Sequence, residues 1–164
     1  MAKEHSMDIS VEFDFQELRN AVEQTKKEVS VRFDLKDAGI VVELEQEAIK
    51  VTAQSDMQVE AVYGVLVKKM ISRGVSPKIL DRQKTAEIGG MKVRQEMKLI
   101  AALDQETAKM LSKKIREAFP KVKPVIQGET VRVTAAKIDD LQGVMAMLKG
   151  DEKIEVPLNF GNYR

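Results

Sequence analysis

Basic side chains recur at alternate positions of three segments that read as β-strands, where they could bind phosphate groups. Residues 91–99 alternate apolar and charged side chains, and residues 49–54 and 131–135 do the same with basic residues and threonines. Because successive side chains of a strand point to opposite sides, each polar series lies on one face. The candidate ligands of phosphate are Lys50, Thr52, Lys92, Arg94, Lys98, Arg132 and Thr134. The alternative is that these residues only solvate an exposed sheet.

A second candidate is Arg32-Phe33-Asp34, which follows an expected helix. An arginine, an aromatic ring and a carboxylate in one loop could stack on a purine and pair with it. The alternative places Phe33 in the core and makes Arg32 and Asp34 a local ion pair. Arg164 ends the segment 159–164, which either closes a groove between domains or is a last strand with a tail.

Catalysis is poorly supported by the residue types. His5 is the only histidine and is expected in a loose N-terminal arm, and the chain has no cysteine. The nucleophile, metalloprotease, P-loop and dinucleotide-binding motifs are missing from the sequence, and Gly89-Gly90 is interpreted as a plain turn. One histidine and dispersed carboxylates do not make a metal cluster. We therefore expect no enzyme activity, no metal and no cofactor.

The elements that position these residues occur twice. Residues 49–66 and 131–148 align at a spacing of 82, which places Val51 on Val133 and Thr52 on Thr134. Each copy is an alternating strand that leads directly into an amphipathic helix. A period near 80 residues is the size of a small domain rather than of a solenoid repeat.

The full pattern is strand-helix-strand-strand-helix-strand, read twice. Carboxylate or hydroxyl caps predict helix starts at Asp14, Ser55 and Asp104, and a fourth helix is expected from about Ile138. Strands are expected at residues 7–13, 40–45, 49–54, 79–83, 91–103, 122–127, 131–135 and 154–162. This order predicts an α+β protein: a tandem of two ferredoxin-like domains. Each has a four-stranded antiparallel sheet with two helices on one face.

The expected boundaries are a first domain at 1–83, a linker at 84–90 and a second domain at 91–164. One ambiguity is open. Residues 79–83 and 91–99 could pair directly across the glycine turn, so that 91–99 fills the first-strand place of the first domain. Residues 7–13 would then fill the same place in the second domain, and the two domains would have exchanged first strands.

The amino-acid composition limits the class of the protein, its location and its partners. The 164-residue chain is 43% hydrophobic and 32% charged, which suits a globular protein. No apolar run is long enough to span a membrane, and the absence of cysteine fits a cytoplasmic location. The net charge is only +1, but residues 1–83 carry 12 basic and 15 acidic residues, against 15 and 11 in residues 84–164. The second half is the better candidate for contact with phosphate.

Ordered segments along the whole chain resemble the YajQ family of bacterial proteins. The matching segments are MAKEHSMDIS, ELRNAVEQ, VRFDLKD, IKVTAQSDMQV, KKMISRGV, VRQEMKL, IQGETVRVTAAKIDDLQGVMAMLKG and LNFGNYR. The resemblance implies tandem ferredoxin-like domains that bind purine nucleotides, RNA in some members and cyclic di-GMP in others.

The chain departs from that family pattern at four positions of its second half. Ile100 replaces a lysine, Ala135 a glycine, Ala136 a lysine and Ile138 an arginine. If phosphates lie there in relatives, binding in this chain is weaker or located elsewhere.

We therefore expect a non-enzymatic cytoplasmic protein that binds a purine nucleotide or cyclic di-GMP at the domain junction or on the open sheet. The alternatives are an RNA-binding accessory factor for tRNA or rRNA, and a module that binds a protein effector without a small ligand. RNA-binding sheets stack bases on aromatic residues, whereas the central outward positions here are Lys50, Thr52, Arg132 and Thr134. RNA binding is thus expected to be weak and sensitive to salt.

Overall fold

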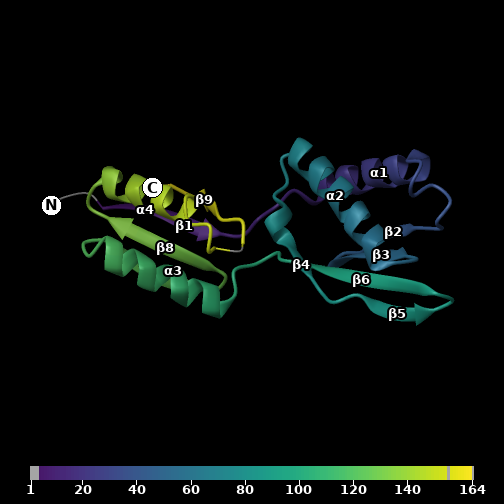
Figure 1. Ribbon diagram of the computed structural model, residues 1–164. Helices are drawn as coiled ribbons and strands as arrows, with labels where there is room; N and C mark the ends of the chain where they lie inside the picture. The colour runs from purple at the N-terminus through teal and green to yellow at the C-terminus, as the bar shows by residue number, and fades with distance from the viewer. Residues whose placement is uncertain (1–3, 155, 164) are drawn as a thin grey trace. The chain divides into compact units, whose positions relative to one another are not determined.

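The protein, seen in a computed structural model that describes residues 4–154 and 156–163, divides into two compact units (Figure 1). The inserted unit is the continuous segment Phe13–Ile100. The terminal unit combines the residues up to Glu12 with the residues from Ala101 onward.

The inserted unit contains two long helices and five strands. Its helices are α1 (Phe15–Val31), α2 (Asp56–Ser72) and a short 3-10 turn, η1 (Pro77–Ile79). Its strands are β2 (Val41–Leu44), β3 (Ala48–Ala53), β4 (Leu80–Arg82), β5 (Ala86–Gly89) and β6 (Lys92–Leu99).

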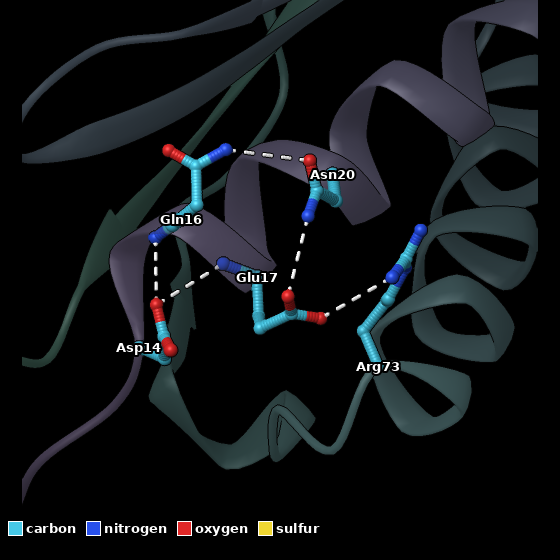
Figure 2. Close-up of polar contacts among 5 residues, drawn as sticks. All are labelled: Asp14, Gln16, Glu17, Asn20 and Arg73. Carbon is cyan, nitrogen blue, oxygen red and sulfur yellow. Dashed lines mark hydrogen bonds and ion pairs between the residues drawn. The ribbon is translucent and has the colours of Figure 1, made fainter.

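The start of α1 is fixed by side chains, as the sequence predicts. The Asp14 carboxylate accepts hydrogen bonds from the backbone N–H groups of Gln16 and Glu17, at 2.9 and 3.2 Å. These donors have no partner within the helix, so the cap satisfies them. Glu17 in turn accepts a hydrogen bond from Asn20 and pairs with Arg73 at 3.6 Å, which ties α1 to the end of α2 (Figure 2).

The sheet of the inserted unit is antiparallel, with the order β2-β3-β6-β4. β4 pairs with one end of β6 and β5 with the other end, so the two short strands follow each other along the same edge of β6. β6 occupies the place of the first strand in a ferredoxin-like order. The unit therefore has a complete ferredoxin-like sheet, although the strand in the first-strand place, β6, is the last strand of the unit in sequence order.

The terminal unit repeats the arrangement. Its strands are β1 (His5–Ser10), β7 (Lys123–Gln127), β8 (Thr130–Ala135) and β9 (Asn159–Gly161), and its helices are α3 (Gln105–Ala118) and α4 (Ile138–Lys149). The sheet order is β7-β8-β1-β9 and all pairs are antiparallel. Asp104 caps α3 through the Thr107 N–H at 2.7 Å, again as predicted.

In each unit both helices cover one face of the sheet. The buried core of the inserted unit combines helical and strand residues, among them Leu18, Val22, Val59, Leu66, Ile49, Val51 and Met97. The terminal unit buries the corresponding set of Leu111, Ile115, Val144, Met7, Ile9, Val131 and Val133. The face of each sheet opposite its helices, called the open face below, carries the predicted polar series.

The exchange of first strands, left open by the sequence, is present. β1 pairs with β8 and β9 in the terminal unit, and β6 pairs with β3 and β4 in the inserted unit. In Figure 1 the purple β1 lies among the green and yellow elements of the terminal unit. The units consequently differ from the contiguous ranges 1–83 and 91–164. The expected linker, 84–90, contains β5 because that segment pairs with β6.

Candidate functional site

The register of the inserted unit shows which side chains share its open face. Across the strands, Val41 is opposite Thr52, which is opposite Arg94. One pleat further along, Glu43 is opposite Lys50, which is opposite Glu96. At the far end, Lys98 lies between Ala48 and Asp81. All four predicted cations of this sheet, Lys50, Lys92, Arg94 and Lys98, therefore lie on the open face.

Carboxylates accompany two of these cations. Lys50 forms an ion pair with Glu45, with Nζ 3.2 Å from Oε1, and has Glu43 and Glu96 as its cross-strand neighbours. Lys98 has Asp81 as its direct cross-strand neighbour. Opposite charges at this spacing attract each other and reduce the positive potential. This end of the open face is thus mixed in sign.

The other end keeps its positive charge. The Nε of Arg94 donates a hydrogen bond to the hydroxyl of Thr52 at 3.1 Å. Lys92 extends towards the turn before β2, where its Nζ lies 3.6 Å from the position of a Cβ atom on Gly39. Within the described part of the chain, no carboxylate forms an ion pair with Lys92 or Arg94.

Exposed apolar side chains border these two cations. Val41 and Ile88 are each 43% exposed, and Met91, at the tip of the β5–β6 turn, is 93% exposed. We call the group of Val41, Thr52, Ile88, Lys92 and Arg94 the basic corner. A guanidinium and an ammonium beside apolar surface can bind an anion that also carries a flat, weakly polar group.

On the open face of the terminal unit, Arg132 is neutralised. Its Nε donates to the Asp8 carboxylate at 3.0 Å, and Asn162 donates to the same carboxylate at 2.7 Å. The hydrogen bond and the charge of Asp8 raise the pKa of the Arg132 guanidinium above its ordinary value. Arg132 is therefore engaged by the fold, and Thr134 lies opposite Ser6. Arg164 lies outside the described residues.

In the loop after α1, the local ion pair of the alternative interpretation is present. The Nε of Arg32 lies 2.8 Å from Oδ1 of Asp34. The placement of Phe33 in the core is wrong, because its side chain is 90% exposed. Leu35, which is 3% exposed, fills the core position instead. Lys36 lies over the Phe33 ring, with Nζ 5.7 Å from the ring centroid.

Lys36 and Lys26 are basic residues that the sequence interpretation missed. Both line a pocket of about 150 Å³ between α1 and the turn that leads to β2. The spacing of three residues between Phe33 and Lys36 was the available signal, since a cation at that distance in a helical turn can reach the ring. The pocket also includes Gly39, which Lys92 approaches from the sheet.

Three further expectations concerned the position of His5, metal binding and membrane-spanning segments. His5 was expected in a loose arm, but it begins β1 opposite Ala135, because the alternating pattern of Met7 and Ile9 extends to it. In residues 4–154 and 156–163, no group of three or more His, Asp or Glu side chains is placed to hold a metal ion. None of the helices in these ranges has the length and apolarity needed to cross a membrane.

The fold and these contacts define a class: a protein of two ferredoxin-like units. At one corner of its inserted sheet, two of the predicted cations, Lys92 and Arg94, form no ion pair among the described residues. Comparison with known proteins identifies the family. A family model described as nucleotide-binding protein YajQ-like matches residues 5–164, so the chain belongs to the YajQ family.

Relatives of similar length are known from several bacteria. A nucleotide-binding protein of Sulfurovum sp. (strain NBC37-1) is 42% identical, and one of Prochlorococcus marinus (strain MIT 9211) is 44% identical. One of Chloroflexus aurantiacus (strain ATCC 29366 / DSM 635 / J-10-fl) is 46% identical. In each comparison the match covers 100% of both chains.

Proposed function

We propose that this protein binds a purine nucleotide or cyclic di-GMP without transforming it, and that the basic corner holds a phosphate of the ligand. The observation that carries this proposal is that the predicted cations differ in their pairing with carboxylates. Lys50 and Arg132 are paired with carboxylates, Lys98 lies opposite one, and Lys92 and Arg94 form no ion pair among the described residues. The names of the relatives, which are nucleotide-binding proteins, support the class of ligand.

The chemistry of the corner suits this role. The Nε of Arg94 is held by Thr52, which fixes the plane of the guanidinium and leaves its terminal nitrogens as phosphate donors. Lys92 supplies a second positive charge. Val41 and Ile88 add exposed apolar surface beside these phosphate donors.

Isothermal titration of the native protein with GTP, ATP and cyclic di-GMP tests the proposal. A charge-assisted hydrogen bond contributes about 1.5–3 kcal/mol, so Arg94→Gln is expected to weaken binding by about 10- to 100-fold. Lys92→Gln is expected to weaken it about tenfold. The matched controls are Lys50→Gln and Lys98→Gln on the same face, which should leave the Kd within about twofold. No heat with any of the three ligands would refute the proposal.

The absence of catalysis is tested in the same samples. After prolonged incubation with GTP or cyclic di-GMP, chromatography should return the ligand unchanged. Steady formation of GDP, GMP or a linear dinucleotide would show that the protein is an enzyme.

RNA binding is the second candidate, and the same corner favours it only weakly. A basic groove that follows a nucleic-acid backbone needs several unneutralised cations, whereas the mixed charges around Lys50 and Lys98 interrupt the series. tRNA or rRNA binding is expected to be weak and lost with added salt.

A protein effector without a small ligand is the third candidate, and exposed Val41 and Met91 are compatible with it. The absorbance ratio at 260 and 280 nm of freshly purified protein separates this case from the first two.

A further inference from the structure

The pocket between α1 and the turn before β2 has the features of a second anion site. It measures about 150 Å³, and its lining includes Lys26 and Ser30 of α1 with Lys36 and Gly39 of the following loop. It borders β2, the edge strand of the inserted sheet. It is formed within the inserted unit alone.

Three ammonium groups approach this pocket. Lys26 pairs with Glu23 at 3.3 Å and is partly neutralised by it, so Lys36 and Lys92 carry most of the positive charge. Lys36 forms no ion pair within the described part of the chain, and its cation lies over the Phe33 ring. Lys92 reaches Gly39 from the open face. The potential in the pocket is therefore positive, and an anion is its complementary ligand.

Nearby charges do not cancel this potential. Asp34 is engaged by Arg32 at 2.8 Å. Asp37 belongs to the same loop, but it is not among the residues that line the pocket. Among the described residues, Lys36 contacts the Phe33 ring and forms no ion pair with a carboxylate.

The Phe33 ring is the other unusual feature. It is 90% exposed and lies beside Lys36, which also lines the pocket. An exposed aromatic side chain next to cations is a stacking platform for a nucleobase, since every base has a π face and the cation strengthens the contact.

The basic lining of the pocket favours the phosphate of a nucleotide over its base. A volume of about 150 Å³ is enough for a phosphoryl group. With the phosphate in the pocket, the base of the same nucleotide lies outside it, where the exposed Phe33 ring offers a stacking face.

We propose that this pocket is a phosphate subsite and that the purine of the same nucleotide stacks on Phe33. The inference rests on the proposed nucleotide binding and specifies it. Lys36 and Lys26 contact the phosphate, and Lys92 connects the subsite to the basic corner across Gly39. Arg32, although adjacent to Phe33, stays paired with Asp34 and contributes little.

Inorganic phosphate tests the subsite without any nucleotide. In 15N-edited NMR spectra of the whole chain, phosphate should shift the backbone signals of Lys36, Gly39 and Ile40 in a saturable way. Sodium chloride at the same ionic strength is the control. Equal shifts with chloride, or no shift at Gly39, would overturn the subsite.

Nucleotide titrations test the stacking. Phe33→Ala and Lys36→Gln are each expected to weaken GTP binding about tenfold. Lys27→Gln, which removes a neighbouring charge of α1 that does not line this pocket, should leave the Kd within about twofold. Because Phe33 lies outside the core, Phe33→Ala should leave thermal stability unchanged. If native protein binds GTP and both variants bind it equally well, the subsite is wrong while the proposed function stands. If native protein binds no nucleotide, the proposed function fails.

Discussion

The terminal unit depends on a strand that is separated from its partners by the whole inserted unit. β1 pairs with β8 on one side and β9 on the other. A fragment of residues 101–164 has a gap in the centre of its sheet, and its β9 has no strand partner. We predict that this fragment is unfolded. The fragment of residues 13–100 has all four strand places filled, and we predict that it folds on its own.

The buried residues of β1 set the magnitude. Met7 and Ile9 are both 0% exposed. Burying a side chain of this size contributes about 1.5–3 kcal/mol, so the two contribute about 3–6 kcal/mol before any backbone hydrogen bonds are counted. An entire domain is usually stable by only about 5–15 kcal/mol. Losing β1 therefore removes much or all of the free energy of unfolding of this unit.

Far-UV circular dichroism and 15N-edited NMR spectra of the two fragments provide the assay. Fragment 101–164 should give narrow proton dispersion and no cooperative urea transition. Adding a peptide of residues 4–14 should restore both, and the same peptide with Ile9→Asp should not. A cooperative transition and dispersed spectrum for 101–164 without peptide would refute the argument that β1 completes the unit.

Three further predictions concern the stability of the protein, and each follows from one residue. Gly143→Ala should destabilise the protein in urea unfolding, because the new Cβ would lie 2.8 Å from the Phe119 ring. Gly64→Ala is the control: a Cβ at this helical position meets open space, so this change should stabilise the protein by about 1 kcal/mol. Met91 has a left-handed backbone with φ 60°, so Met91→Gly should stabilise by about 1 kcal/mol, and no gain would show that the strain is absent. Hydrogen bonds from Thr107 lower the pKa of Asp104 below its ordinary value. The cap therefore stabilises α3 at pH values above the pKa that Asp104 has in the unfolded chain. This stabilisation is lost as the pH falls through the lower pKa that Asp104 has in the folded protein. Asp104→Ala should cost about 1 kcal/mol at pH 7, and this cost should shrink as the pH is lowered into the acid range; a pH-independent difference would contradict this role.

Local patterns predicted the elements well. Asp14 and Asp104 cap their helices because capping depends on residues within one turn. The alternation around Lys50 and Arg94 placed them on one face for the same reason, since strand periodicity is a local property. The family resemblance seen in the sequence is confirmed by a model match over residues 5–164.

Local sequence patterns could not predict which distant residues pair with each other. Lys98 has Asp81, and Arg132 has Asp8, as partners only because of strand register. The sequence therefore could not separate neutralised cations from free ones. Nor could it decide that Leu35, rather than Phe33, enters the core, since both are apolar and two residues apart.

The strand exchange also bears on synthesis of the chain at the ribosome. Asp8 and Arg132, which face each other across β1 and β8, are 124 residues apart. At about 5–20 residues per second, β1 has emerged roughly 6 to 25 s before its neighbour exists. The inserted unit is complete by then and can fold first. β1 thus leaves the ribosome long before its partner strands and is among the last to find its place, and its apolar side must be kept from other chains in the meantime.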